Sequence, residues 1–306
     1  MHIPDGFLSP EVALACAVPA AAAVAIGLRR ANTDLDERRV PLLGVTAAFV
    51  FAAQMLNFPV AGGTSGHFLG AALAAILLGP WLACLTLAVV LGVQALLFAD
   101  GGITALGANV FNMGVAGALV VGALMRAANA VAPKRLVTIS AVGAWLAVMT
   151  GAALTAVELA ASGTVPLGTV LPAMLGTHAL IGVGEAAITL AAVSAVLATR
   201  PDLINQPAPV GRPALARPFV VVGLAVAIGL ATAASPFASS HPDGLERVAE
   251  DKGFAVAGQA SSGPISDYAF PGLDDARLAT GLAGFAGTLA VFAVGSALVR
   301  GRRRLA

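Results

Sequence analysis

The sequence predicts an all-α protein that crosses a membrane several times. The chain of 306 residues is 58% hydrophobic and only 11% charged, whereas a soluble domain has roughly 25% charged residues. Apolar runs of about 20 residues, the length that spans a bilayer as a helix, recur along the chain. Glycine and alanine are abundant, which is typical of membrane helices that pack closely through small residues.

Hydropathy predicts nine spanning segments. The third is short, since a helix over residues 67–80 reaches only about 21 Å, less than the hydrocarbon core of about 30 Å. The stretch GGTSGH before it, residues 62–67, is expected to be a loop that dips toward the protein interior. The nine segments cover residues 10–28, 41–58, 67–80, 81–99, 108–128, 136–160, 170–198, 218–236 and 277–299.

The basic residues predict the orientation. With the N-terminus outside, the inner loops hold 14 of the 17 Lys and Arg residues, and the outer loops hold only Arg247, Lys252 and Arg277. This asymmetry favours nine spans in a cell membrane, N-terminus out and C-terminus in. A cleaved signal peptide is not expected, because no basic region precedes the first apolar run and Arg29 and Arg30 follow it.

The chain divides into two predicted modules. Residues 1–200 carry seven spans, residues 201–217 form a proline-rich cytoplasmic linker, and residues 218–306 carry two more spans. Residues 237–276 are expected to form an acidic loop on the outer side. Its acids are Asp243, Glu246, Glu250, Asp251, Asp267, Asp274 and Asp275.

The opening stretch MHIPDGFLSP offers nitrogen ligands for a metal ion. The Met1 amine, the His2 amide and the His2 Nδ1 are successive nitrogens, so binding all three closes a five-membered and then a six-membered ring. A planar nitrogen field of this kind suits Ni(II) or Cu(II). His67 is the candidate for the fourth corner, if the segment folds back with Phe7 and Leu8 as an apolar plug.

His178 and Glu185 lie seven residues apart in the seventh span, on one face of a helix. Two interpretations stay open, a polar track and a hydrogen-bonding network that orients helices. A third hypothesis is an intramembrane metal-dependent enzyme, in which Glu185 would be the general base.

The remaining polar residues are expected to have roles other than metal binding. Asn57, Asn109 and Asn112 favour helix caps or interhelical bonds, Glu158 is expected to be solvated, and His241 is expected to be a solvated loop residue. The two cysteines, Cys16 and Cys84, lie in apolar runs, which indicates buried free thiols.

Several function classes lack their motifs. The chain has no P-loop, no H-E-x-x-H and no G-x-S-x-G. It therefore lacks the motifs of P-loop ATP-binding proteins, zinc proteases and serine hydrolases. The net charge is only +1 and no basic stripe is present, so a nucleic-acid partner is not expected. Any active transport would therefore draw on a partner ATPase or, alternatively, on an ion gradient as in a secondary permease.

Four blocks of residues 1–200 resemble the membrane substrate-binding component of energy-coupling factor transporters for cobalt or nickel, the CbiM/NikM type. The region after the linker, with HPDGLERVAEDKGF, resembles the small CbiN/NikN subunit with its PDGLE motif, so the chain looks like a natural fusion. The four blocks are MHIPDGFLSP, FAAQMLNFPVAGGTSGHFLGAALAAILLGPW, QALLFADGGITALGANVFNMGVAG and HALIGVGEAAIT.

The resemblance implies a transport subunit, not an enzyme, with Ni(II) or Co(II) as its substrate and no organic cofactor. It implies a T-type transmembrane coupling protein and two cytoplasmic ATPase subunits as partners. Many relatives begin MHIMEG instead of MHIPDG, so the choice of metal stays open. The implied ligands are Met1, His2 and His67, with Asn57, Thr64, Ser65 and Gly66 shaping the site.

Overall fold

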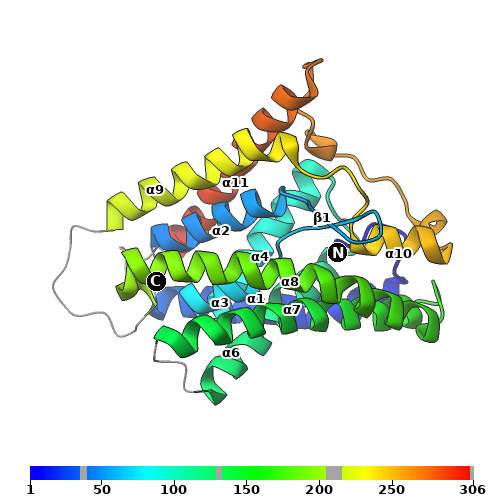
Figure 1. Cartoon of the computed structure of the whole chain (residues 1–306), viewed down its shortest axis with the longest axis horizontal. Helices are drawn as coiled ribbons and strands as arrows, with labels where there is room; N and C mark the ends of the chain where they lie inside the picture. Colours follow the sequence, from blue (N-terminus) through cyan, green and yellow to red (C-terminus); the bar gives the residue numbers. More distant parts are fainter. Residues whose placement is uncertain (35–39, 129–132, 205–215, 304–306) are drawn as a thin grey trace.

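The structure, a computed structural model, describes residues 1–34, 40–128, 133–204 and 216–303. Its long helices run side by side, and the N-terminus, the hairpin strand β1 and helix α10 gather at one end of the bundle (Figure 1). The all-α, multi-pass fold class is confirmed. This end of the bundle is where the predicted ligands lie.

Seven helical segments of the described chain are long and apolar enough to cross a membrane. Each overlaps one of the nine predicted segments and departs from it by only a few residues at either end. The segments are Pro10–Ala31, Pro80–Phe98, Leu106–Ala127, Arg135–Ala161, Leu167–Thr199, Pro218–Phe237 and Ala276–Val299.

The second and third predicted segments are shorter than expected. Helix α2 (Val40–Gln54) ends before Asn57, so the prediction that it continues to residue 58 was wrong. Helix α3 (Ala71–Leu78) has only eight residues, because Gly70 and Gly79 on either side adopt left-handed φ angles of 82°. Pro80 then begins α4 (Pro80–Val93).

A two-stranded hairpin joins α2 to α3. Strands β1 (Phe58–Val60) and β2 (Thr64–Gly66) are antiparallel, and the turn between them uses Gly62 and Gly63 with positive φ, which glycine adopts without strain. The second strand is fully buried. The expectation that this stretch enters the protein interior is therefore confirmed.

The first module is built around the pair of long helices α7 (Pro133–Ala161) and α8 (Leu167–Thr199), which pack along each other. Helix α1 (Pro10–Asp34) packs against α4. Two segments contain π-helical turns, which often occur at functional sites. The other elements are the π-turn η1 (Gln94–Phe98), α5 (Leu106–Asn109), the π-turn η2 (Val110–Ala116), α6 (Gly117–Ala127) and the 3₁₀ turn η3 (Pro201–Leu203).

The second module contains two long helices that lie beside α2 (Figure 1). The segment between them crosses to the N-terminus, where Gln259 forms a β-bridge with Asp5. Residues 205–215 of the predicted linker lie outside the described residues. The elements are α9 (Ala216–Gly229), η4 (Leu230–Ala234), η5 (Ser235–Phe237), α10 (Gly244–Lys252), η6 (Ala255–Ala257), η7 (Ser266–Tyr268) and α11 (Ala276–Arg303).

Candidate metal centre

The first residues of the chain fold back into the bundle. The Asn109 side chain binds both sides of Ile3, accepting from its N–H at 2.8 Å and donating to its carbonyl at 3.0 Å. The Gly102 N–H also donates to the Ile3 carbonyl, at 2.9 Å. Met1, Ile3 and Phe7 are buried. Backbone groups buried in this way need such partners, so Asn109 fixes the path of the segment.

The expected apolar plug is present at Phe7. Its ring meets the edge of the Phe254 ring, with centroids 5.4 Å apart, while Leu8 is only half-buried. Thr164 donates to the Phe7 carbonyl at 2.5 Å. The segment is therefore held at both ends, by Asn109 near Met1 and by these contacts near Phe7.

The structure brings Met1, His2 and His67 together. The Met1 amine lies 2.8 Å from His67 Nε2, and the His2 and His67 rings stack with centroids 5.0 Å apart. Nitrogens at adjacent corners of a planar site are also about 2.8 Å apart when each is about 2.0 Å from the ion. The hydrogen bond therefore has the spacing that a shared metal ion requires.

Asp243 is a member of the site that sequence reasoning missed. Its Oδ1 caps α10, accepting from the N–H groups of Leu245 at 2.8 Å and Glu246 at 2.9 Å. Its Oδ2 forms an ion pair with the Met1 amine and lies 3.6 Å from His67 Nε2. The quoted PDGLE motif contained this residue, but nothing local in the sequence places it beside Met1.

The electrostatics of this cluster are set by burial and by the amine. Burial acts to raise the pKa of Asp243, but the positive N-terminal amine and the His67 hydrogen bond hold that pKa well below its ordinary value. Burial lowers the pKa of His2 to about 4, against the smaller opposing effect of Asp100. His2 is therefore neutral at pH 7 and keeps a nitrogen lone pair for a metal.

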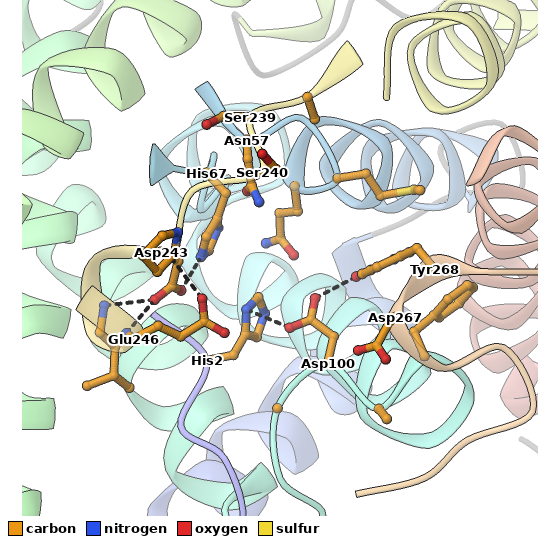
Figure 2. Close-up of a pocket in the computed structure, with 18 of the residues that line it drawn as sticks. His2, Asn57, His67, Asp100, Ser239, Ser240, Asp243, Glu246, Asp267 and Tyr268 are labelled. Atoms are coloured by element: carbon orange, nitrogen blue, oxygen red, sulfur yellow. Dashed lines mark hydrogen bonds and ion pairs between the residues drawn. The ribbon is translucent and has the colours of Figure 1, made fainter. Parts of the chain in front are cut away.

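Asp100 is the second residue that sequence reasoning missed. Its Oδ1 lies 3.1 Å from His2 Nδ1, and its Oδ2 accepts a 2.5 Å hydrogen bond from the Tyr268 hydroxyl. Figure 2 shows His2 between Glu246 and Asp100, facing both carboxylates. An ion bound to His2 Nδ1 would have to take the place of Asp100 at that nitrogen.

The residues expected to shape the site mostly hold the second module in place. The Ser65 N–H donates to the Pro242 carbonyl at 2.9 Å, and the Ser65 hydroxyl donates to the His241 carbonyl at 2.8 Å. The Asn57 carbonyl accepts from the Ser239 N–H at 2.8 Å. Thr64 is buried in the same strand, and a side chain at Gly66 would meet Ile181 at 2.8 Å.

His178 and Glu185 are both buried, but each bonds to a different part of the backbone. His178 Nδ1 contacts the Met174 carbonyl at 2.8 Å. The two oxygens of Glu185 accept from the N–H groups of Leu69 and Gly70, at 2.6 and 3.0 Å. Glu185 thus holds the start of α3 next to His67. A carboxylate engaged at both oxygens is poorly placed to act as a general base.

The expectation that Glu158 is solvated was wrong. Glu158 is buried, where Asn112 donates to it at 2.7 Å and the Cys16 thiol at 3.3 Å. These bonds join α1, η2 and α7 inside the bundle, because an acid placed among packed helices needs buried partners. The interhelical bond expected of Asn112 and the burial of both free cysteines are confirmed, whereas Asn109 makes neither a helix cap nor an interhelical bond and instead holds the backbone of Ile3.

A cavity of about 720 Å³ opens beside the cluster, between the two modules. His2, His67 and the carboxylates of Asp100, Asp243, Glu246 and Asp267 line it (Figure 2). Within the described part of the chain, no three His, Cys, Asp or Glu side chains lie close enough to hold a metal by themselves. A metal site here would need further ligands beside these side chains, and the Met1 amine is a nitrogen that lies 2.8 Å from His67 Nε2.

Comparison with known proteins shows two matching families. Residues 2–203 match the family described as the cobalt uptake substrate-specific transmembrane region, CbiM. Residues 217–304 match the PDGLE domain.

Individual relatives match almost the whole chain. A putative fused nickel transport protein NikMN of Archaeoglobus fulgidus is 40% identical over 302 residues, 98% of both chains. The fused nickel transport protein NikMN of Rhodobacter capsulatus is 34% identical and matches 89% of this chain and 84% of its own. The crystal structure of a truncated transition metal transporter, 36% identical, superposes with a TM-score of 0.58 over 65% of this chain and 99% of its own.

Proposed function

Since this chain belongs to the CbiM family, ends in a PDGLE domain and is a membrane component of nickel or cobalt transport, we propose that it captures the metal ion through its own N-terminus. The ligands are the Met1 amine, the His2 amide, the His2 Nδ1 and the His67 Nε2. The ion is the substrate of the protein, which passes it across the membrane.

The spacing of 2.8 Å between the Met1 amine and His67 Nε2 is the observation that carries this proposal. The His2 ring already stacks on the His67 ring, so the two imidazoles that the site needs lie side by side. Two adjacent corners of a planar nitrogen site are thus in position before any ion arrives. The neutral state of His2 adds to this preorganisation, because the ring loses no proton at pH 7 and needs only to shift its one proton from Nδ1 to Nε2.

Binding requires two exchanges. The Met1 amine gives up its ion pair with Asp243, and His2 Nδ1 turns from Asp100 toward the ion. The amine and the His2 amide each lose a proton to water, and the ring proton of His2 moves from Nδ1, where it faces Asp100, to Nε2. Four strong nitrogen ligands in a plane favour Ni(II), whereas Co(II) would take further ligands, for which the adjacent cavity has room.

The energy for transport comes from partner proteins in this proposal. The chain has no P-loop of its own. A T-type transmembrane coupling protein and two cytoplasmic ATPase subunits would complete the transporter. Metal uptake in cells should then stop when the partner ATPase genes are deleted, and uptake that continues without them would identify a secondary permease instead.

The direct test is the ligand set of the bound metal. X-ray absorption of the purified chain loaded with nickel should show four nitrogen ligands. Acetylation of the Met1 amine, or His67→Ala, should weaken binding by more than about 100-fold, since even outer residues of metal sites account for roughly 10–100-fold. His241→Ala is the matched control, because His241 lines the same cavity but is not a proposed ligand. Tight nickel binding by the acetylated chain would refute the proposal.

A further inference from the structure

The cavity beside Met1, His2 and His67 has an acidic lining, and none of its carboxylates is among the proposed nitrogen ligands. Four carboxylates line it, those of Asp100, Asp243, Glu246 and Asp267, and no Lys or Arg is among its described lining residues. A cleft with one sign of charge concentrates ions of the opposite sign and accelerates their arrival. The ion that this cavity attracts is therefore a cation.

Two of the acids are free for this task. Asp267 makes no ion pair or hydrogen bond within the described residues, and Figure 2 shows its carboxylate next to Asp100, on the side away from His67. Glu246 uses only Oε2, which accepts from the Asp243 N–H at 2.9 Å. Asp267 also has a φ of 56°, a backbone conformation that Asp tolerates better than most residues.

Two buried side chains that line the cavity keep a polar atom without a partner in the described chain. Gln54 is 5% exposed, and its amide nitrogen donates to the Leu69 carbonyl at 2.8 Å, which leaves Oε1 unpaired. The His2 side chain is 9% exposed, and its Nε2 is unpaired as well. Buried polar atoms in native structures have partners. An unpaired carbonyl oxygen needs a donor, and water bound to a metal ion is a strong one.

The spacing of the acids decides the form of the cation. No three of the described His, Cys, Asp and Glu side chains lie close enough to share one bare ion, yet the cavity of about 720 Å³ is large enough for an ion with its hydration shell. Carboxylates that surround an ion at this spacing reach it through its own water. The lining thus suits a divalent cation that retains its hydration shell.

From these observations we infer that the cavity is a second cation site, which holds the hydrated Ni(II) or Co(II) ion through water between the Asp267, Glu246 and Asp100 carboxylates and Gln54. The inference rests on the proposed function, because this ion is the one that then moves to the nitrogen ligands. Along this route the ion sheds water stepwise, from a carboxylate-lined cavity to a buried nitrogen site.

Hexaamminecobalt(III) is the probe for this site. It resembles a hydrated metal cation in size and hydrogen bonding, but its ligands do not exchange, so it cannot enter the nitrogen site. Equilibrium dialysis of the purified full chain should reveal a saturable component of hexaamminecobalt(III) binding. The double variant Asp267→Asn with Glu246→Gln should lack this component; Gln at 246 still offers the oxygen that caps α10.

Stopped-flow nickel binding gives the functional readout. At low salt the double variant should take up Ni(II) roughly tenfold more slowly than the parent, and the nitrogen ligands should be occupied to the same extent at equilibrium. Hexaamminecobalt(III) should slow the parent but not the double variant. The matched control combines Asp274→Asn with Glu250→Gln; it removes two charges from the same loop outside the cavity and should behave as the parent.

Two results would overturn the inference. One is equal hexaamminecobalt(III) binding by parent and double variant, and the other is an unchanged nickel association rate in the double variant. A parent chain that binds hexaamminecobalt(III) in the cavity but never binds nickel through nitrogen would instead refute the proposed function and leave the cavity site standing. The dialysis and the kinetics thus separate the two failures.

Discussion

The N-terminal segment and helix α10 meet beside the Met1 amine and His67, but they are held there in different ways. Residues 1–9 lie inside the bundle, with Ile3 completely buried and bonded on both sides by Asn109. Helix α10 lies over them and reaches the ligands through one side chain, that of Asp243. Its neighbour Val256 is 92% exposed. The difference indicates that the first region builds the site and the second covers it.

Removal of the Asn109 anchor should have the largest effect. Asn109→Ala leaves the Ile3 N–H without its side-chain partner, at a cost of about 1–3 kcal/mol for an unsatisfied group, while the Ile3 carbonyl keeps the Gly102 N–H. Nickel affinity should fall roughly 100-fold, or about 3 kcal/mol, because the amine is no longer held beside His67. Titration calorimetry measures this loss.

Asn57→Ala is the matched control for that variant. Asn57 lines the cavity, and its backbone carbonyl, which remains in the variant, makes the contact with Ser239. Its affinity should change by less than about threefold, as expected of a substitution within about 0.5 kcal/mol. Equal losses in both variants would show that the N-terminal segment is not specifically anchored.

Asp243→Asn should have the next largest effect. It should loosen helix α10, which covers the site, and leave the Asn109 contacts of the N-terminal segment intact. Asn still caps α10, but the ion pair with the Met1 amine is lost, which removes about 1.5–3 kcal/mol. Amide exchange at Leu245 and Val248 should accelerate roughly 10- to 100-fold, as hydrogen-exchange mass spectrometry can record.

Asp275→Asn is the control, since Asp275 caps α11 instead, through the N–H groups of Arg277 and Leu278. Exchange in α10 should stay at the parent rate in this variant. Parent-like exchange in Asp243→Asn as well would mean that the apolar face of α10 alone holds the cover in place.

Glu185→Gln tests the support of the His67 side of the site. The amide keeps one acceptor for the two N–H groups of Leu69 and Gly70, so the free energy of unfolding should fall by about 1–2 kcal/mol. Thermal unfolding in detergent measures the change. Glu250→Gln, on the exposed face of α10, should shift stability by less than about 0.5 kcal/mol. Equal melting temperatures would argue against a structural role for Glu185.

The smallest effect belongs to the outer face of the cover. Arg247 and Asp251 form an exposed pair one helical turn apart, with 3.2 Å between Nε and Oδ2. Arg247→Gln should change the stability of α10 by only about 0.3–0.5 kcal/mol. Hydrogen exchange in α10 should stay close to that of the parent. A loss as large as that of Asp243→Asn would mean that the exposed Arg247–Asp251 pair stabilises α10 as much as Asp243 does.

Errors in the predicted fold concentrate at helix ends and at buried acids. The apolar runs predicted the long helices well, because a membrane helix satisfies its backbone within its own segment. Hydropathy could not reveal that α2 stops at Gln54 or that α3 has only eight residues. Glu158 was misplaced for a related reason, since its partners Asn112 and Cys16 come from other helices.

The sequence by itself determined the helical class, and it predicted the two modules and the candidate chelate at Met1 and His2. These depend on local composition or on covalent neighbours, and successive nitrogens of one chain stay close in any fold. Only the tertiary structure decided that Asp100 faces His2, that Asp243 faces His67, and that four carboxylates line one cavity. Such contacts join residues far apart in the chain, and their distances are set by helix packing.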